Sequence, residues 1–516
     1  MKDPAAADPR SLRGAWYTPP ALVDFLWRQV ARPGVHSVLE PSCGDGVFLH
    51  RAPSGLQIQG VELEPQEAEK ARASGHLVHT GDFLEWASAQ EPGRYDAAIG
   101  NPPYIRYQYL SPQQQDRAQA EFRRAGLPFT RHTNAWVPIV VASLRLLRPG
   151  GQLAMVLPAE LLHVLHSQGL RDHLLRECSQ VVVLDTERLW FPEALQGTVL
   201  LIAEKGKGPA RLQIQACPGD AFLHRDLPTP SSTGEDLLGA KWMPALLPPG
   251  ARSLWDQLQA HPAVRPLGQR ARAEVGMVTG ANAFFLVPQA VVQEYALEPW
   301  AKPAFGRSEQ APGALFDAAQ HQRNVAAGKP AWMLHFSEPL GPGARRWLAE
   351  GEAKGLHQRY KCRIRKPWWS LPSAWVAPVA MLKRSHSLHR LVWNQAGAYQ
   401  TDTAYRLRPF EGESAPGLVA SFVNSLTALG TELHGRHYGG GVLELVPSEI
   451  ARLPSLNLDL DVPPADLLLR DEPDPERVLA QRDPRVLGAI GLSERDQETL
   501  REAWALLRRR RRKESP

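Results

Sequence analysis

The stretch Ser37-Val-Leu-Glu-Pro-Ser-Cys-Gly-Asp-Gly46 decides the fold class of this chain. Its first four residues form a short apolar run that predicts a β-strand, and small residues follow at once. Small residues after a strand permit a tight turn and let the backbone approach a ligand at the carboxyl edge of a sheet. Any nucleotide-binding α/β fold offers such a turn, so the stretch predicts a ligand site without identifying the ligand.

Outward from this turn, short apolar runs alternate with helical patterns. Strands are predicted over 37–40, 57–62, 95–100, 152–157, 180–185 and 198–204, and helices over 21–30, 64–74 and 135–147. Strands and helices that alternate at this spacing predict a parallel, doubly wound α/β sheet of the Rossmann-like kind.

The alternation stops near residue 205, which predicts several domains. Pro- and Gly-rich stretches follow over 228–234 and 244–250, and a further helix is predicted over 417–435. We expect an α/β domain over 1–205, a linker over 206–250, an α+β domain over 251–470 and a helical, basic tail over 471–516. The terminal run Arg508-Arg-Arg-Arg-Arg-Lys513 is expected to be a disordered tail that attracts nucleic acid loosely.

Composition excludes several protein classes. Of the 516 residues, 43% are hydrophobic and 22% charged, which is typical of a globular protein and excludes disorder as the main state. No apolar run reaches the roughly 18 to 20 residues that span a bilayer, and the N-terminus lacks the apolar core of a secretory signal. The four cysteines lie far apart and form no C-x-x-C pair. We therefore expect a soluble, reduced, cytoplasmic protein without a bound metal.

Positive charge is concentrated in the middle of the chain. The net charge is +5, but residues 206–400 alone hold 23 Lys and Arg against 13 Asp and Glu. A local surplus of this kind is typical of a surface that binds a polyanion, although a solvated basic face explains it equally well on charge alone.

Acidic residues follow three predicted strands in turn. Glu40 ends the first strand, and Glu62 ends the second, where a carboxylate can accept hydrogen bonds from ribose hydroxyls. Asp82-Phe83 ends the third, where a carboxylate can accept from an adenine amino group while the ring packs on the base. Each acid alone could be a helix N-cap, but three at successive strand ends favour a single nucleoside site.

The fourth strand ends in Asn101-Pro102-Pro103-Tyr104, the most specific feature of the chain. The two prolines stiffen the loop and donate no backbone N–H. The Asn101 side-chain oxygen and the Pro102 carbonyl can therefore accept from one shared amino group, which methylation of an exocyclic amine requires. Tyr104 supplies a ring on which an aromatic base can stack.

With these motifs in this order, the chain resembles the γ-class, TaqI-like N6-adenine DNA methyltransferases of restriction–modification systems. The resemblance covers residues 15 to about 205 tightly and the second half more loosely. One departure is Ser42, which stands where many methyltransferases have the first glycine of the cofactor loop.

The resemblance implies a class I S-adenosylmethionine-dependent methyltransferase sheet and a C-terminal α+β target-recognition domain. It implies catalytic roles for Asn101, Pro102, Pro103, Tyr104 and Phe191, the last as the ring that faces Tyr104 across a flipped adenine. It implies S-adenosyl-L-methionine binding by Tyr17, Thr18, Pro19, Glu40, Cys43, Gly44, Gly46, Glu62, Asp82 and Phe83.

Double-stranded DNA is the expected partner. The expected DNA-binding residues combine cations with the neighbouring Trp368 and Trp369; they are Arg359, Lys361, Arg363, Arg365, Lys366, Lys383 and Arg384. We expect a monomer, and any cognate endonuclease should be a separate protein because the first motif begins at Tyr17.

Two alternatives remain open on the sequence. The same Asn-Pro-Pro-Tyr loop serves methyltransferases that act on RNA amines or on protein glutamine. A specificity module that binds DNA without catalysis would not need an intact catalytic loop. Methylation of cytosine at carbon 5 is disfavoured, because that reaction needs a cysteine nucleophile and Cys43 lies in the cofactor loop.

Overall fold

The computed structural model describes residues 17–191, 197–230, 232–372, 374–460, 469–470 and 474–512. It divides into two compact units. Unit 1 contains Met1–Leu247, His437–Gly441 and Arg510–Pro516, and unit 2 contains Pro248–Arg436 and Val442–Arg509. None of the described helices is long and apolar enough to cross a membrane.

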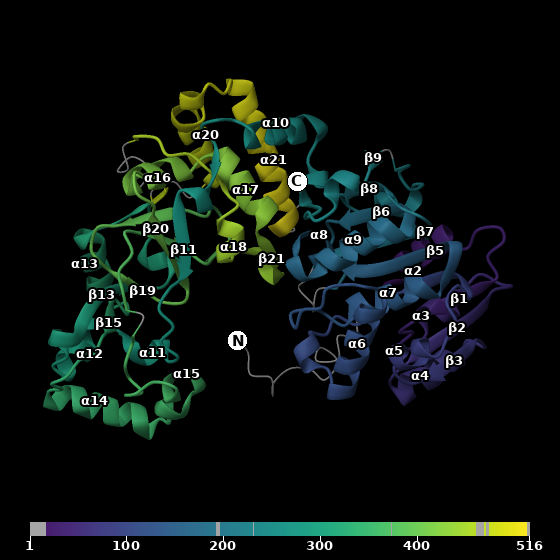
Figure 1. The fold of residues 1–516 in the computed structure, drawn as a ribbon, viewed down its shortest axis with the longest axis horizontal. Coiled ribbons are helices and arrows are strands. Elements are labelled where there is room, and N and C mark those ends of the chain that lie inside the picture. Colours follow the sequence, from purple (N-terminus) through teal and green to yellow (C-terminus); the bar gives the residue numbers. More distant parts are fainter. Residues whose placement is uncertain are drawn as a thin grey trace. The chain divides into compact units, whose positions relative to one another are not determined.

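A nine-stranded sheet forms the centre of unit 1, with strand order β3-β2-β1-β4-β5-β7-β6-β8-β9 (Figure 1). The strands are β1 (Ser37–Glu40), β2 (Gln57–Glu62), β3 (Leu77–Thr80), β4 (Tyr95–Gly100), β5 (Leu147–Pro158), β6 (Cys178–Thr186), β7 (Thr198–Lys205), β8 (Arg211–Cys217) and β9 (Ser232–Thr233). From β3 to β5 all neighbours are parallel, and the strand order reverses between β1 and β4. In open α/β sheets, ligands bind at the carboxyl ends of the strands beside such a reversal.

Helices cover the sheet of unit 1. They are α2 (Pro20–Val30), α3 (Val47–His50), α4 (Pro65–Arg72), α5 (Phe83–Ser88), α6 (Pro112–Arg124), α7 (Trp136–Leu146), α8 (Glu160–His163) and α9 (Gln168–Glu177). Successive residues such as Ala154 and Met155 of β5 point to opposite faces and are both fully buried. Both faces of the sheet are therefore covered, and the predicted α/β class is confirmed.

The sheet is mixed rather than wholly parallel, which corrects the sequence prediction. β7 lies between β5 and β6 and is antiparallel to both. The chain returns from Thr186 to Thr198 over residues 187–197, too few for the crossover that a parallel connection needs.

The linker predicted over 206–250 is wrong, because its residues up to Leu247 complete unit 1 and unit 2 begins at Pro248. β8 pairs in parallel with β6, and β9 pairs with β8. Trp242 is fully buried, and its backbone N–H donates to Leu162 O at 2.9 Å. Apolar and polar residues alternate in Arg211-Leu-Gln-Ile-Gln215, a strand pattern that the surrounding Pro and Gly residues obscured.

Unit 2 combines small sheets with helices, as an α+β domain does. Its larger sheet has the order β11-β20-β16-β18-β14, and a second has the order β12-β15-β13-β19. The strands of these sheets are β11 (Ala271–Val275), β12 (Leu286–Val287), β13 (Ala301–Phe305), β14 (Leu315–Phe316), β15 (Trp332–Leu334), β16 (Val379–Leu382), β18 (Leu391–Asn394), β19 (Tyr399–Gln400) and β20 (Ala404–Pro409). The longer helices are α10 (Pro249–Gln259), α13 (Ala318–Ala326), α14 (Pro342–Ala353), α16 (Ala415–Phe422), α17 (Ser425–His434), α20 (Pro475–Val486) and α21 (Glu494–Arg512).

The helix predicted over 417–435 is two helices, α16 and α17. Asn424 lies between them in an extended conformation, and its side chain accepts a hydrogen bond from the backbone N–H of Thr427. Asparagine favours such an N-cap over a helix interior, so the residue ends one helix and begins the next.

The terminal arginines are helical, so the prediction of a disordered basic tail is wrong as far as Arg512. They form the last turns of α21, and Arg510 and Arg511 are each only 5% exposed. Within unit 1, Arg510 forms a bidentate ion pair with the fully buried Asp185, and Arg511 donates to the Gly441 carbonyl. Lys513 lies outside the described residues.

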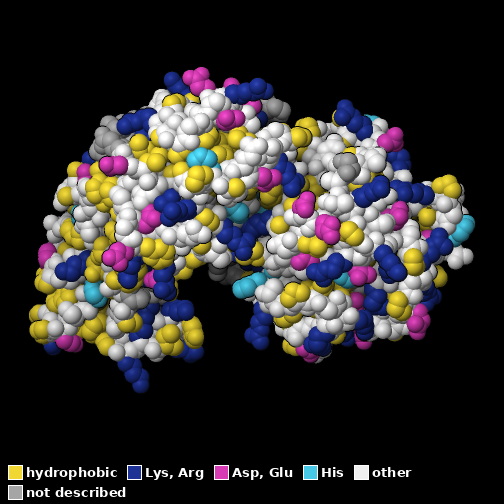
Figure 2. Space-filling model, turned by 45° about the horizontal axis from the view of Figure 1, so that its top comes forward, with side chains coloured by type: hydrophobic (Ala, Val, Ile, Leu, Met, Phe, Trp, Pro, Cys, Tyr) yellow, Lys and Arg dark blue, Asp and Glu magenta, His cyan; other side chains and the backbone are white. Residues whose placement is uncertain are grey.

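Lys and Arg side chains are scattered over the visible face of unit 2 (Figure 2). On that face, the Lys and Arg side chains do not gather into one broad basic surface. The small helix α15 (Tyr360–Arg363) follows α14 and lies within the basic segment 359–366.

Candidate active site

A cavity of about 410 Å³ opens at the carboxyl ends of β1, β2 and β4 in unit 1. Its size is within the range of about 300 to 1,000 Å³ that is usual for cofactor sites. Of the predicted site residues, the cavity is lined by Tyr17, Thr18, Glu40, Cys43, Gly44, Glu62, Asp82, Phe83, Asn101 and Pro103. The predicted convergence of the three acids and the Asn-Pro-Pro-Tyr loop is thus seen in the structure.

The turn after β1 forms one wall of the cavity. Cys43 donates its backbone N–H to Val61 O at 3.0 Å, and Gly46 donates to Cys43 O at 2.8 Å. Gly46 has φ 86°, and a Cβ there would lie 2.7 Å from the Ala71 Cα of α4. Glycine is required at this position, and its role is to shape the turn rather than to line the cavity.

Glu62 ties the turn to the end of β2. Its two carboxylate oxygens accept from the backbone N–H groups of Gly44 and Glu64, each at 2.8 Å. Burial raises the pKa of Glu62, and these backbone donors act in the opposite direction. Each oxygen keeps a further lone pair, so the fixed carboxylate can still accept from ligand hydroxyls.

Glu40 is buried beneath the turn, and its Oε2 has no hydrogen-bond partner among the described residues. Burial raises the pKa of Glu40 well above its ordinary value, and the neighbouring Glu62 and Asp45 raise it further. A buried acceptor without a partner is costly, so this carboxyl suits a ligand that brings a donor or a positive charge.

Asp82 serves both as a helix N-cap and as a wall of the cavity. Its Oδ1 accepts from the backbone N–H of Glu85 at 3.0 Å, at the start of α5. Phe83 follows with 7% of its surface exposed, and its ring lies 6.1 Å from that of Trp86. Asp82 therefore caps α5 and lines the cavity at the same time, so the N-cap does not exclude a ligand contact.

The loop after β4 meets the N-terminal motif. Asn101 donates from Nδ2 to Thr18 Oγ1 at 3.2 Å, and the Ser42 hydroxyl donates to Asn101 O at 3.5 Å. The Tyr17 hydroxyl donates to Glu67 Oε2 at 3.3 Å. Three segments that are distant in the sequence therefore surround the cavity, and Ser42, the departure from the family pattern, takes part.

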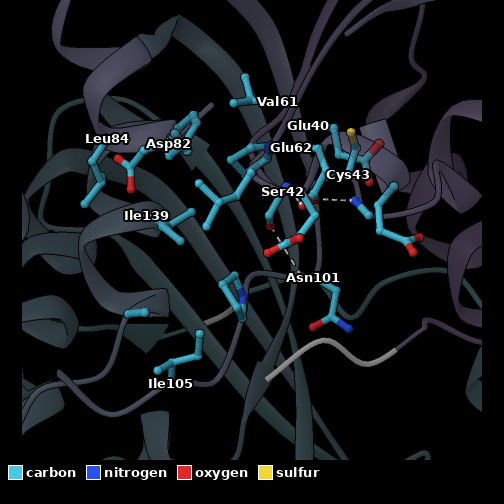
Figure 3. A pocket seen from close by; sticks show the side chains of 18 of the residues that line it. Glu40, Ser42, Cys43, Val61, Glu62, Asp82, Leu84, Asn101, Ile105 and Ile139 are labelled. Atoms are coloured by element: carbon cyan, nitrogen blue, oxygen red, sulfur yellow. Dashed lines mark hydrogen bonds between the residues drawn. The ribbon is translucent and has the colours of Figure 1, made fainter. Parts of the chain in front are cut away.

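The charged side chains in the described lining of the cavity are all acidic. The lining holds six carboxylates and no Lys, Arg or His; the carboxylates are Glu40, Asp45, Glu62, Glu64, Glu67 and Asp82. In Figure 3, Asp82 and Leu84 lie on one side and Glu40 and Cys43 on the other, with Asn101 below. Such a lining disfavours the pyrophosphate of a dinucleotide and favours a ligand that carries positive charge and hydroxyl donors.

Five predicted residues are absent from the described lining of this cavity: Pro19, Gly46, Pro102, Tyr104 and Phe191. Tyr104 is half-buried, and its hydroxyl donates to Val156 O of β5 at 3.2 Å. Phe191 is 3% exposed and packs in the hydrophobic core that includes Val156. The roles assigned to Tyr104 and Phe191 stay predictions.

Sequence reasoning missed the apolar wall of the cavity. It comes from the segment after Tyr104, from α6 and from the start of α7. Its members are Ile105, Tyr109, Leu110, Ala118, Ala135, Pro138 and Ile139, and Gln114 of α6 adds one polar side chain. Ser111 begins α6 with a capping box, a signal that could have located the helix. No sequence signal tells which of its faces borders a ligand.

The seven predicted DNA-binding cations fall into two groups in unit 2. Arg359, Lys361, Arg363 and Lys366 are exposed. Arg365 donates to Thr279 O at 2.9 Å, and Glu444 pairs with Lys383 at 3.2 Å and with Arg384 at 2.6 Å.

The two tryptophans that follow these cations also have structural contacts. The Trp368 ring lies 5.6 Å from that of Phe284, and the Trp369 ring lies 6.2 Å from that of Phe336. The interleaving of cations with aromatic rings seen in the sequence is therefore retained mainly around Tyr360.

Cys43 is not poised as a nucleophile. It is 3% exposed, and burial together with the nearby Glu40 raises the pKa of its thiol. The thiol stays protonated at neutral pH, whereas the thiolate is the nucleophilic form of cysteine.

Two family models match the chain in succession. The Eco57I restriction-modification methylase model matches residues 56–190, and the model of the type II methyltransferase M.Eco57I C-terminal domain matches residues 239–487. The first match covers the ends of β2, β3 and β4 with their site residues, and the second lies almost entirely in unit 2.

Curated proteins that resemble this chain are named type II methyltransferases. Type II methyltransferase M.TthHB8I of Thermus thermophilus is 32% identical over 40% of this chain and 48% of its own length. Type II methyltransferase M.AccI of Acinetobacter calcoaceticus is 20% identical over 82% of this chain and 81% of its own. The solved structure of the type IIG restriction endonuclease BpuSI covers 98% of this chain and 66% of its own, with 15% identity and a TM-score of 0.41. The chain spans half or less of the length of three type II methyltransferases that it matches.

Proposed function

We propose that this chain, which belongs to the γ-class family of restriction–modification methyltransferases, methylates the exocyclic N6 amino group of adenine in double-stranded DNA. The observation that carries the proposal is that Asn101 and Pro103 line a cavity whose described residues include six carboxylates and no Lys, Arg or His. The family models support it along both units.

The cavity fits S-adenosyl-L-methionine as the methyl donor. That cofactor combines a cationic sulfonium and an ammonium group with ribose hydroxyls and an adenine ring, and it supplies an electrophilic methyl group. The fixed Glu62 carboxylate suits the ribose hydroxyls, Asp82 and Phe83 suit the adenine, and the carboxyl of Glu40 suits a cationic group.

The chain's own residues would act on the acceptor base. A target inside a duplex must leave the base stack to reach such a cavity. Asn101 Oδ1 and the Pro102 carbonyl would accept hydrogen bonds from the adenine amino group, which draws the nitrogen lone pair out of conjugation with the ring. Tyr104 and Phe191 would stack on the extruded base, and no covalent enzyme intermediate is needed because the base is the nucleophile. Positioning would supply much of the rate.

The test is transfer of labelled methyl groups from S-adenosyl-L-methionine to unmethylated genomic DNA, with total RNA and total protein in parallel. The proposal expects label in DNA that digests to N6-methyladenine. Label confined to RNA or protein would keep the fold and cofactor and overturn the acceptor. Binding of DNA with no transfer to any of the three would favour a specificity module.

A further inference from the structure

Two apolar side chains are exposed within the basic segment of unit 2. Tyr360 is 62% exposed and Ile364 is 59% exposed, one helical turn apart around α15. We call residues 359–366 the basic tip. An isolated exposed apolar residue is ordinary on a protein surface, so exposure alone says little.

Tyr360 and Ile364 are unusual because exposed cations surround them. Arg359, Lys361, Arg363 and Lys366 are all exposed, and none has an acidic partner among the described residues. Lys361 Nζ lies 5.5 Å and Arg363 Cζ lies 5.7 Å from the centre of the Tyr360 ring. In Figure 2, hydrophobic and basic side chains lie together at the lower end of unit 2, where Figure 1 has α15.

The base of the basic tip is held firmly while its outer face is exposed. Cys362 is fully buried, and its Sγ lies 3.7 Å from Thr279 O, which Arg365 also contacts at 2.9 Å. Gly280 has φ 77°, and a Cβ there would lie 2.8 Å from the Lys361 Cβ. These contacts fix the outward direction of the tip before any ligand binds, which reduces the entropy lost on binding.

The charges of the basic tip indicate the kind of partner. Its four exposed cations, which have no acidic partner among the described residues, attract a polyanion. Tyr360 and Ile364, which lie among these cations, would be stabilised if that polyanion also offered an apolar surface. Duplex DNA offers both, because phosphates flank base steps into which apolar side chains can insert. An aromatic ring can also stack on any base, whatever the sequence.

We propose that Tyr360 and Ile364 form a wedge that inserts at a base step of DNA, while Arg359, Lys361, Arg363 and Lys366 contact the flanking phosphates. The inference rests on the proposed function in taking double-stranded DNA as the partner. The wedge belongs to unit 2 and the cavity to unit 1, and the proposal assigns the wedge to a base step other than the methylated adenine.

The test uses the full chain and a duplex that contains its methylation site. DNA affinity is measured by fluorescence anisotropy at several salt concentrations for the wild type, Tyr360→Ala and Lys361→Ala. The control is Phe410→Ala, since Phe410 is also exposed in unit 2, at 45%, but is flanked by Glu411 and the nearby Glu413.

The wedge predicts different behaviour for each variant. Tyr360→Ala should weaken binding roughly 5- to 150-fold without changing the salt dependence, because stacking releases no counterions. Lys361→Ala should lower the slope of log affinity against log salt by about 0.9. Phe410→Ala should bind as the wild type does, and all variants should melt at the wild-type temperature.

A fluorescent base analogue locates the wedge. 2-Aminopurine placed in turn along the duplex should brighten at a second position besides the methylated adenine, and Tyr360→Ala should abolish only that second signal. If the wild type methylates DNA but Tyr360→Ala binds with wild-type affinity and no second position brightens, the wedge is overturned and the proposed function stands. If the wild type neither binds nor methylates DNA, both are overturned.

Discussion

The cavity of unit 1 and the basic tip of unit 2 both concentrate charge, but in opposite ways. Six carboxylates line the cavity. Among them, Glu40 is buried, and Glu62 is held by the backbone N–H groups of Gly44 and Glu64. The four exposed cations of the basic tip surround Tyr360 and have no acidic partner among the described residues. Buried charges are screened little by salt, whereas interactions between exposed charges are largely screened beyond the Debye length of about 10 Å at 0.1 M salt.

The two regions therefore suit ligands that differ in size and in exposure to solvent as well as in the sign of their charge. A small cationic cofactor with hydroxyl groups suits fixed, desolvated carboxylates. A long polyanion suits exposed cations that release its counterions on contact. Substitutions in the two regions should therefore change different measurements.

The largest effect is expected at a third charged region, the end of α21. Arg510→Ala leaves Asp185 buried without its partner, so the free energy of unfolding should fall by about 3–5 kcal/mol. Arg363→Ala in the basic tip is the matched control and should change it by less than about 0.5 kcal/mol. Urea denaturation measures both. Equal losses in the two variants would contradict the contrast between buried and exposed arginines.

The next effect concerns catalysis. Asn101→Ala removes a positioned acceptor, and methyl transfer should fall by at least about 100-fold, the range seen when one positioned hydrogen bond is lost from an active site. Affinities for cofactor and DNA, measured by calorimetry and anisotropy, should stay near the wild type. Gln108→Ala, an exposed residue of the same segment, should keep full activity. Near-normal transfer by Asn101→Ala would remove the catalytic assignment.

A smaller effect concerns the pH dependence of cofactor binding. The raised pKa of Glu40 means that its carboxyl is neutral at low pH and gains its negative charge only above the ordinary carboxyl range. A cationic ligand prefers the charged form, so cofactor affinity should rise with pH through that raised pKa. Glu40→Gln should flatten this rise and weaken binding roughly 10- to 150-fold at high pH, since a hydrogen bond to a charged group is worth about 1.5–3 kcal/mol.

The control for the pH profile is Glu69→Gln on α4. The Glu69 side chain is 77% exposed and outside the described lining, so its loss should leave the profile unchanged. A wild-type affinity that falls as pH rises would contradict the role given to Glu40.

The smallest effect compares two lysines of unit 2. Lys366→Ala should lower the slope of log DNA affinity against log salt by about 0.9, because its exposed ammonium is available to a phosphate. Lys383→Ala should lower it less, since Glu444 already neutralises that ammonium at 3.2 Å. Equal changes in the two slopes would show that the pairing seen here does not decide which cations meet DNA.

The sequence was informative where function follows from strand ends. The carboxyl ends of neighbouring parallel strands meet at one edge, so Glu40, Glu62 and Asn101 could be brought together before any coordinates were known. Glu62 shows what the sequence could not predict. Its residue type and position predicted a ribose contact, but its hydrogen bonds from the backbone N–H groups of Gly44 and Glu64 depend on the conformation of the turn.

The sequence was least informative where a partner lies far along the chain. The segments 508–512 and 359–366 look alike in the sequence, because both are rich in cations. In the first segment, however, Arg510 is buried in an ion pair with Asp185, which lies 325 residues away along the chain. Glu444 removes Lys383 and Arg384 from the set of free cations in the same way. A run of charge tells how many cations are present, and only tertiary contacts tell which are free.

The most direct measurement of the central claim is the mass-spectrometric identification of the methylated nucleoside, combined with the mapping of modified sites. Genomic DNA without prior methylation is incubated with the chain and S-adenosyl-L-methionine, and with Asn101→Ala in parallel. We predict N6-methyladenine at one recurring sequence with the wild type and none with the variant. Methylation of cytosine carbon 5, or N6-methyladenine that persists with Asn101→Ala, would contradict the account.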